Sequence, residues 1–398
     1  MKLNKITKVL TVLLCLVLVF GCVNAMIDKS DNNEAESADA TAQSSSTTKS
    51  GYTEANLLCA GDNLIHQAIF VQAGQRAGGS GYDFSYAYKN VKDIVSSADI
   101  AFLNQETVMV PSKDASSYPL FNSPPELLDE MIEIGFDVFN QSTNHVMDKH
   151  LDGALENYEL FQSKENILLT GLYKTWDDMF IPQTVTKNDI TFSFMGFTEF
   201  LNGLRVPADS DLGLVYLTDT RHTQAELYDT MQKMIDAGKK SSDIVCVSMH
   251  WQTEDITAPD ESQKEIAQKL VDMGADIIIG TGPHVLQPIE FFEREDGSKA
   301  LVIWSLGNFI STQANDPNLL GGLADVTVRK DYATGKVTIS DVGFIPTVTH
   351  YGSGRSNVRI IPFKDYSESL AASHGAGTTY SFMKNFYEEM FGDYLRVN

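Results

Sequence analysis

The chain has 398 residues, of which 43% are hydrophobic, and it carries a formal net charge of −23 from 30 Lys and Arg against 53 Asp and Glu. The apolar content is enough for a large packed core, and the negative balance argues against a nucleic-acid-binding protein and against electrostatic adhesion to anionic lipid. An anionic substrate must therefore be met by local cations, either a metal ion or a few arginines.

A leader precedes the folded part of the chain. Early lysines lead into an apolar run that is too short to span a membrane, which needs about 20 residues, and this pattern predicts a signal peptide over residues 1–21. The run ends in Val19-Phe20-Gly21-Cys22, which is typical of a lipobox in which Cys22 is acylated. The alternative is an ordinary signal with an incidental cysteine. The lipobox interpretation predicts an exported protein, lipid-anchored on the outer face of the cytoplasmic membrane.

Composition divides the rest of the chain. Residues 22–52 are dense in Ser, Thr, Ala, Asp and Glu and cannot bury enough apolar surface to offset the entropy of ordering, so they predict a flexible tether. Residues 53–365 are predicted to form one domain, and residues 366–398 a helical extension of it. Cys59 and Cys246 each lie within an apolar run and are predicted to be free and buried.

From residue 55, short β-rich runs alternate with amphipathic helical stretches. In chain order the pattern predicts a strand at 57–60, a helix at 86–98, a strand at 99–103, a helix at 125–134, a strand at 136–140, a helix at 151–163, strands at 167–169 and 190–197, a helix at 220–237, a strand at 243–248, a helix at 261–273 and a strand at 276–280. Such alternation is typical of an α/β domain. The helices then stop, and strands are predicted at 288–292, 301–305, 323–329, 336–344 and 358–361, before a last helix at 378–395. These later strands predict a mixed or second sheet.

Six of the predicted strands run directly into polar residues of the kinds that bind metal ions. The residues expected to meet are Asp62, Glu106, Asn144, His145, His250 and His284. Because the carboxyl ends of parallel strands share one edge of a sheet, where ligands bind, we expect these side chains to surround one cleft. Imidazole, carboxylate and amide groups suit Zn²⁺, Mn²⁺, Fe²⁺ or Mg²⁺ rather than a thiolate site. The pattern therefore predicts a centre for one or two divalent ions.

Each of these residues also has an ordinary structural interpretation, which the sequence leaves open. Asp62 can cap a helix, and Asn144 can close a turn through its own side chain. Glu106 can be a loop carboxylate, His284 a turn residue, and His250 a core histidine. The site is favoured because six such strand endings are hard to obtain by chance.

Other polar residues are predicted to support this centre or its substrate. Those near the strand ends are His66, Asp148, Glu254 and Asn308. Three residues separate Asp62 from His66 and can turn the histidine away, and the others suit hydrogen bonds to ligands. Arg205, Arg355 and Arg359 are candidates to bind substrate carboxylates, although most arginines are simply solvated.

The order of these motifs resembles the CapA family, capsule-synthesis proteins associated with poly-γ-glutamate. The motifs are Gly61-Asp62, Asn104-Gln105-Glu106, Thr143-Asn144-His145-Val146-Met147-Asp148, His250-Trp251-Gln252-Thr253-Glu254, Gly282-Pro283-His284-Val285-Leu286-Gln287, Ser305-Leu306-Gly307-Asn308-Phe309 and Phe344-Ile345-Pro346-Thr347. Each motif is weak alone, whereas the ordered set covers roughly residues 54 to 362. The family is similar in fold to the calcineurin-like metallophosphoesterases, which implies a four-layer α/β/β/α sandwich of two sheets flanked by helices.

The resemblance also implies roles for particular residues. It implies a dinuclear centre in which Glu106 bridges the ions, Asn144 and His250 are ligands, and His145 is a proton donor.

The chain departs from the family pattern at two positions. Gly282 stands where the family usually has His before the Pro-His pair, and Gln252 stands where it usually has Gly after His-Trp. A missing histidine ligand leaves open whether the centre holds one ion or two.

Three functions remain open from the sequence. The leading hypothesis is a cell-surface, metal-dependent hydrolase or transferase of an anionic envelope polymer such as poly-γ-glutamate, with His145 or Glu106 handling the proton. The second is a non-catalytic partner of a membrane-bound polymer synthase, which Gly282 favours. The third is a metal-dependent phosphoesterase, although the chain lacks an Asp-x-His start and a Gly-Asp-x-x-Asp second motif.

Overall fold

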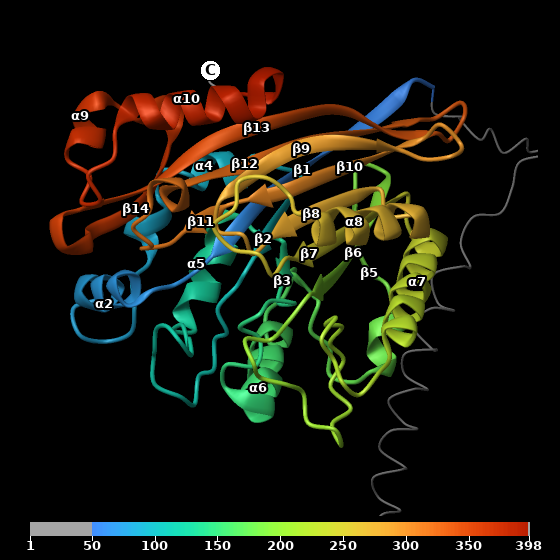
Figure 1. Ribbon diagram of the computed structural model, residues 1–398, viewed down its shortest axis with the longest axis horizontal. Helices are drawn as coiled ribbons and strands as arrows, with labels where there is room; N and C mark the ends of the chain where they lie inside the picture. The colour runs from blue at the N-terminus through green and yellow to red at the C-terminus, as the bar shows by residue number, and fades with distance from the viewer. Residues whose placement is uncertain (1–49, 397–398) are drawn as a thin grey trace, which may run out of the picture. The chain divides into compact units, whose positions relative to one another are not determined.

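The computed structural model describes residues 50–396, which fold into two β-sheets packed face to face with helices on both outer sides (Figure 1). The predicted signal peptide, Cys22 and nearly all of the predicted tether lie outside these residues. Among the residues that are described, no helix is both long and apolar enough to cross a membrane.

The first sheet combines a parallel half with an antiparallel half. Its order is β14-β13-β12-β1-β2-β3-β4, and β11 pairs in parallel with the end of β1. The strands are β1 (Tyr52–Asn63), β2 (Ile100–Asn104), β3 (Val138–Asn140), β4 (Leu168–Thr170), β11 (Asn308–Ile310), β12 (Leu320–Asp331), β13 (Val337–Gly352) and β14 (Ser356–Pro362). Strands β1 to β4 are parallel, so their carboxyl ends lie at the same edge.

The second sheet has the order β5-β6-β7-β8-β10-β9. The strands are β5 (Gln183–Lys187), β6 (Ile190–Thr198), β7 (Ile244–His250), β8 (Ile277–Thr281), β9 (Leu286–Glu293) and β10 (Lys299–Leu306). Its four central strands, β6, β7, β8 and β10, are parallel. The sheet therefore also has an edge where several carboxyl ends meet.

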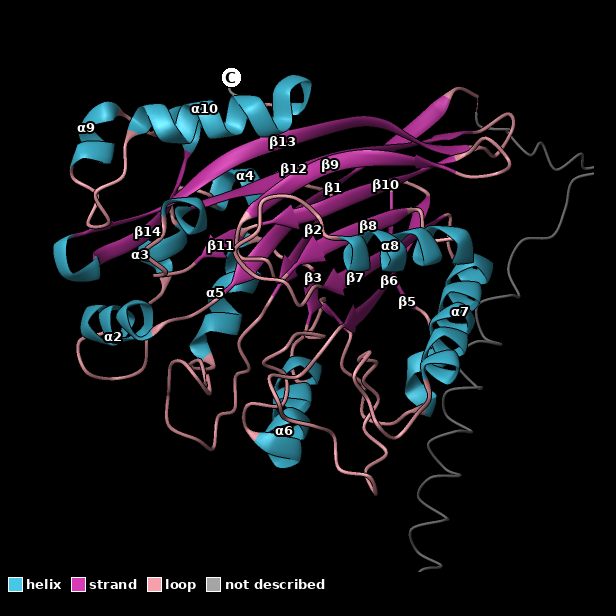
Figure 2. Ribbon diagram, viewed as in Figure 1, coloured by secondary structure: helices cyan, strands magenta, loops and turns pink. Residues whose placement is uncertain are grey.

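Helices cover both outer faces and one end of the sandwich (Figure 2). The first sheet carries α2 (Gln67–Arg76), α3 (Ser85–Tyr88), α4 (Lys92–Ser96), α5 (Glu126–Ile134) and α6 (His150–Gln162). The second carries α7 (Gln224–Ser241) and α8 (Glu261–Met273). The C-terminal segment forms α9 (Glu368–Ala372) and α10 (Tyr380–Phe391), and α10 packs Phe391 on Phe344 of β13 with ring centroids 3.6 Å apart.

Strand alternation explains the layers. In β1, Leu57 and Cys59 belong to the core between the sheets, whereas Leu58 and Ala60 belong to the core under the helices. Successive side chains of a strand point to opposite faces, so a strand buried on both faces must be apolar at every position. The predicted α/β fold of two sheets flanked by helices is confirmed, as are the free, buried states of Cys59 and Cys246.

Some elements differ from the sequence-based prediction. The helix predicted at 86–98 is two short helices, α3 and α4, interrupted at residues 89–91. Within the interruption, the side-chain amide of Asn90 donates to the carbonyl of Ile360 at 2.8 Å. Helix α2 and strands β5 and β11 were not predicted. Strand β11 has three residues and exists only through its pairing with β1, which is distant in sequence.

Candidate metal centre

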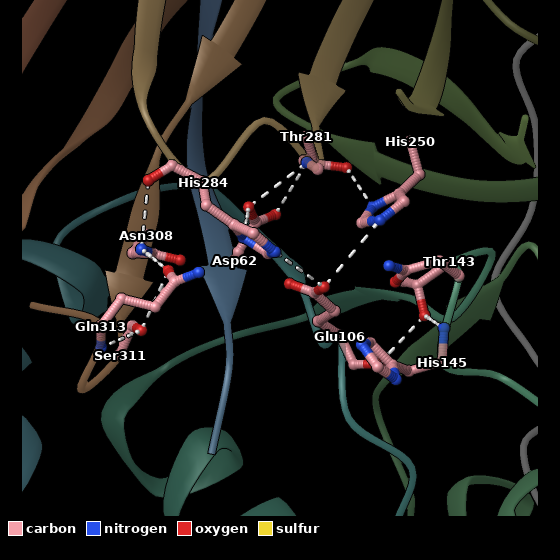
Figure 3. Close-up of polar contacts among 12 residues, drawn as sticks. Asp62, Glu106, Thr143, His145, His250, Thr281, His284, Asn308, Ser311 and Gln313 are labelled. Atoms are coloured by element: carbon pink, nitrogen blue, oxygen red, sulfur yellow. Dashed lines mark hydrogen bonds and ion pairs between the residues drawn. The ribbon is translucent and has the colours of Figure 1, made fainter. Parts of the chain in front are cut away.

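The carboxyl ends of the two parallel strand sets bring polar side chains together between the sheets (Figure 3). Asp62 lies near the end of β1 and Glu106 follows β2, both from the first sheet. His250 ends β7, and His284 lies between β8 and β9 of the second sheet. All four are buried, so the group is a closed polar cluster inside the fold.

Glu106 is at the middle of this cluster and is unsatisfied. Neither carboxylate oxygen has a hydrogen-bond partner among the described residues, although the side chain is fully buried. Its Oε1 lies 3.5 Å from Nε2 of His284 and 3.9 Å from Nε2 of His250. Burial raises the pKa of Glu106 well above its usual range, against the opposing effect of His284. A buried carboxylate without a hydrogen bond is costly, so this position calls for positive charge, from a protonated His284 or from a bound cation.

The distances within the cluster suit a shared divalent ion. Ligand atoms about 2.1 Å from a tetrahedral ion lie about 3.4 Å from one another. The distances from Glu106 to the two imidazoles are close to this value. Asp62, Glu106 and His284 also each offer a ligand atom within 4.8 Å of the others. The residues present therefore fit a divalent metal.

His250 is held so that one ring nitrogen remains available. Its Nδ1 lies 3.1 Å from Oγ1 of Thr281, the residue directly opposite in the β7–β8 register. Its buried Nε2 has no partner among the described residues. Burial lowers the pKa of His250 to about 3, which keeps the ring neutral. When Nδ1 carries the ring proton and donates a hydrogen bond to Oγ1 of Thr281, Nε2 has a free lone pair on the side of Glu106. A metal ligand needs such a free lone pair.

Asp62 is, by contrast, fully engaged by protein donors. It accepts from Asn104 Nδ2 at 2.8 Å and from the backbone N–H of Gly282 at 3.2 Å, and its Oδ2 lies 2.9 Å from Nδ1 of His284. Asn104 in turn accepts at 2.8 Å from Asn140, at the end of β3. Burial disfavours the charge, but the hydrogen bonds from His284 and Asn104 and the positive charges of His284 and His250 together outweigh it, so the pKa of Asp62 is lowered.

His284 lies between two carboxylates. Burial alone would lower the pKa of His284, but the negative charges of Glu106 and Asp62 raise it to about 10. Its Nδ1 faces Asp62 and its Nε2 faces Glu106. A carboxylate on Nδ1 orients the imidazole, and a divalent ion would bind Nε2 in place of the proton that this nitrogen carries in the metal-free protein.

The structure leaves no room for a side chain at Gly282. Its φ is +100°, and a Cβ at this position would lie 2.5 Å from the carbonyl oxygen of Trp251 and 3.1 Å from Nε2 of His250. The backbone N–H instead donates to Asp62. His284, two residues later, also has a positive φ of 59°, which non-glycine residues rarely adopt. This connection is therefore a constrained turn at the centre.

His145 and Asp148 form a second group beside the centre. Nδ1 of His145 lies 2.7 Å from Oδ2 of Asp148, which also accepts from the backbone N–H of Phe121 at 2.7 Å. Asn202 Nδ2 lies 3.3 Å from Nε2 of His145, and the adjacent Asn144 has a buried Oδ1 without a partner among the described residues. Figure 3 labels His145 next to Thr143, whose hydroxyl donates to the backbone carbonyl of Glu106 at 2.9 Å. The group provides an oriented imidazole and a free amide oxygen.

The remaining predicted residues lie around the cluster or away from it. His66 is at the margin, where its Nδ1 accepts from the backbone N–H of Thr312 at 3.3 Å. Asn308 donates to the carbonyl of His284 at 3.1 Å and so supports its turn. Glu254 and Arg205 are exposed, and neither makes a hydrogen bond to the cluster.

Three residues with clear positions in the site were missed from the sequence. They are Asn140, Thr281 and Asn202, which contact Asn104, His250 and His145 respectively. Asn140 and Thr281 are the last residues of strands, so the strand-end pattern includes them. Their partners depend on parallel register and on a loop from the second sheet, which no local pattern encodes.

The chain belongs to the family of bacterial capsule synthesis proteins designated PGA_cap, whose model matches residues 56–313. It is 28% identical over 242 residues to the PGA biosynthesis protein CapA of Bacillus subtilis (strain 168), covering 61% of this chain and 60% of that protein. It is 26% identical over 239 residues to the capsule biosynthesis protein CapA of Bacillus anthracis, covering 58% of this chain and 55% of that one. The chain thus spans less than two thirds of the length of these relatives.

Solved structures also resemble the fold. One is described as a novel phosphatase from Mycoplasma pneumoniae, with a TM-score of 0.41 and 14% identity, covering 74% of this chain and 94% of that chain. Another is a hypothetical protein from Thermus thermophilus, with a TM-score of 0.39 and 14% identity, covering 73% and 98%.

Proposed function

We propose that this capsule-synthesis protein is a metal-dependent hydrolase or transferase that acts at the cell surface on an anionic envelope polymer of the poly-γ-glutamate type. The proposal rests on one observation above all, the buried and unpartnered carboxylate of Glu106 beside Nε2 of His250 and Nε2 of His284. The name of the Bacillus subtilis relative, a PGA biosynthesis protein, supplies the polymer class, and the Bacillus anthracis relative is named for capsule biosynthesis. The surface location follows from the proposed lipidation of Cys22.

We assign the residues of the centre as follows. Glu106, His250 and His284 are the ligands, with Oδ1 of Asn144 as a further one, and Asp62 holds His284 in place. A bound divalent ion, Mn²⁺, Zn²⁺, Fe²⁺ or Mg²⁺, supplies Lewis-acid polarisation of a substrate oxygen and a lowered pKa for bound water.

His145 is the proposed proton donor and acceptor. Asp148 fixes its Nδ1 at 2.7 Å, and Nε2, which lies 3.3 Å from Nδ2 of Asn202, is the atom proposed to face the substrate. The ring stays near the surface of an otherwise closed cluster, with its side chain 7% exposed. An imidazole oriented by a carboxylate is suited to general acid–base chemistry.

A second candidate is a non-catalytic partner of a membrane-bound polymer synthase. Gly282 favours it, because the turn there leaves no room for a side chain and removes one potential ligand. In this alternative the centre holds a structural ion.

Metal content tests the proposal. We expect the purified chain to contain about one divalent transition-metal ion by elemental mass spectrometry, and a Glu106→Ala, His250→Ala double variant to contain none. The metal-loaded protein is then assayed on poly-γ-glutamate by the appearance of shorter chains. A chain that takes up no metal after incubation with manganese and zinc would overturn the metallohydrolase. A loaded chain that leaves the polymer unchanged would favour the synthase partner.

A further inference from the structure

A groove extends from the margin of the candidate centre along α2. It consists of two hollows of about 590 and 510 Å³ between α2 and the β13–β14 turn, which includes the 3₁₀ helix η4 (Ser353–Arg355). Ala68, Val71 and Gly354 line both hollows, so they form one continuous groove, defined here as the α2 groove. Helix α2 and this turn lie side by side at the end of the first sheet (Figure 1).

The α2 groove differs in charge from the rest of the molecule. None of its lining residues is Asp or Glu, although the chain has 53 of these among 398 residues. Two of them are arginines, with Arg355 in the hollow that His66 also lines and Arg76 in the other. A cationic hollow on a protein of charge −23 is a local site for an anion.

More positive charge lies next to Arg76. The guanidinium of Arg76 is 4.1 Å from the ring centroid of Tyr86, Lys89 Nζ is 4.4 Å from it, and Arg359 is 5.9 Å from it. The ring face attracts cations but does not neutralise them. Asp83 is the carboxylate that influences Arg76, and its Oδ1 is hydrogen-bonded to the start of α3. Three cationic side chains therefore lie within 6 Å of the centroid of the Tyr86 ring.

The arginines of this region are also unpaired. Four of the eight arginines form ion pairs, namely Arg221, Arg294, Arg329 and Arg396. Of the other four, Arg76 and Arg355 line the α2 groove, and Arg359 lies beside Tyr86 next to Arg76. None of these three forms an ion pair with a carboxylate of residues 50–396, so their charges are available to a ligand.

The walls of the groove are fixed to each other. The side-chain amide of Gln72 donates to the carbonyl of Arg355 at 2.8 Å and accepts from the N–H of Val358 at 3.2 Å. Nε of Arg355 donates to the carbonyl of Thr312 at 2.9 Å, and no hydrogen bond to a described residue uses its Nη atoms. A guanidinium held through Nε is preorganised to bind a carboxylate with its remaining donors.

Ring contacts through the buried Phe121 connect the inner hollow to the residues beside the centre. His66 lines its inner hollow and lies edge-on to Phe121, with centroids 5.4 Å apart. Phe121 contacts His145 edge-on at 4.7 Å. Val71 and Tyr118, which also line the inner hollow, are 41% and 76% exposed. Apolar surface between cations suits a chain in which methylene groups separate carboxylates.

We propose that the α2 groove binds a flexible polycarboxylate chain beside the candidate centre. The inference rests on the proposed function for the choice of polymer. Carboxylates pair with Arg355 at the inner end and with Arg76, Lys89 and Arg359 at the outer end, and the methylene groups contact Val71 and Tyr118. Helix α2 rises about 15 Å over its length, so the groove takes several repeats of a polymer.

Binding of metal-free protein to fluorescent poly-γ-glutamate tests this proposal. We compare an Arg76→Gln, Arg355→Gln variant with a Lys233→Gln, Lys240→Gln variant, which changes the net charge equally on exposed positions of α7. Fluorescence anisotropy in excess EDTA and low salt should show binding about tenfold or more weaker for the arginine variant and unchanged for the lysine variant. Because Arg355 also holds Thr312, a single Arg76→Gln variant is measured too and should lose about threefold.

Several results would contradict the proposal. Unchanged binding by the arginine variants, an equal loss in the lysine variant, or no binding by the wild type would overturn it. Equal arginine-dependent binding of polyphosphate and poly-γ-glutamate would overturn the polycarboxylate assignment. The measurement contains no metal, so failure of the metallohydrolase appears separately, as absent metal or absent turnover in a chain that still binds the polymer.

Discussion

Two buried carboxylates a few ångströms apart have opposite surroundings. Asp62 accepts hydrogen bonds from a side-chain amide, a backbone N–H and an imidazole, whereas Glu106 accepts none through its side chain. The pKa of Asp62 is accordingly lowered and that of Glu106 raised. In the proposed centre we therefore take Asp62, which the sequence offered as a ligand, to position His284, and Glu106 to hold the cation.

This difference predicts unequal effects of removing each charge. We expect Asp62→Asn to weaken metal affinity by about 10- to 100-fold, since the amide holds His284 without a charge, while Glu106→Gln abolishes binding. Titration of the metal-free proteins with zinc or manganese, followed by elemental analysis, gives both values. If Asp62→Asn loses the metal as completely as Glu106→Gln, Asp62 is itself a ligand.

At the scale of an element, the β8–β9 connection controls the centre. It supplies Gly282, whose N–H donates to Asp62, and His284, which lies between the two carboxylates. Both residues have positive φ values, so the turn holds its conformation through its contacts rather than through intrinsic preference.

Substitutions at Gly282 should test this turn. Gly282→Ala places a Cβ 2.5 Å from the carbonyl oxygen of Trp251 at a φ of +100°, so we expect it to lower the free energy of unfolding by about 2–4 kcal/mol. Gly297→Ala is the matched control, because its φ is +78° but nothing lies within 4 Å, and it should cost only about 1 kcal/mol. Urea denaturation measures both.

Gly282→His, which restores the residue usual in the family, should destabilise the protein in the same way and bind no additional ion. A stable Gly282→His variant with an extra ion per chain would show that the turn can accept a ligand there.

At the scale of the whole molecule, buried histidines couple stability to pH. His350 in β13 is buried, with Nδ1 2.8 Å from the hydroxyl of Tyr366 and its ring 5.1 Å from that of His374. Burial, with Arg359 and His374, lowers the pKa of His350 to about 4. The unfolded chain, with a pKa of about 6.5, then binds more protons than the folded one between these values, so stability falls as the pH falls from about 6.5 to 4.

We therefore expect His350→Gln to reduce the dependence of stability on pH. The urea midpoint of the wild type should fall between about pH 6.5 and 4.5, and that of the variant should fall less steeply. Tyr366→Phe serves as the control, because it removes the hydrogen bond but keeps the histidine, so it should lower the midpoint without flattening the slope. Equal slopes in the wild type and His350→Gln would contradict the assignment to His350.

The sequence by itself determined the class of fold and the family. Apolar strands and amphipathic helices have hydrophobic periods of about two and 3.6 residues. These periods are local properties, so they can be read directly from the sequence. The sequence also predicts that Asp62, Glu106, His250 and His284 lie close together. Each follows a predicted strand, and parallel strands have their carboxyl ends at the same edge of a sheet.

Only the tertiary structure decided how these residues are used. Thr281 orients His250 through the register between two strands, and Asn140 reaches Asp62 through Asn104 across three strand ends. At the α2 groove, the side chain of Gln72 donates a hydrogen bond to the carbonyl of Arg355, although the two residues are 283 positions apart in the chain. Such partners follow from packing and register, which depend on the whole folded chain rather than on the pattern of any one segment.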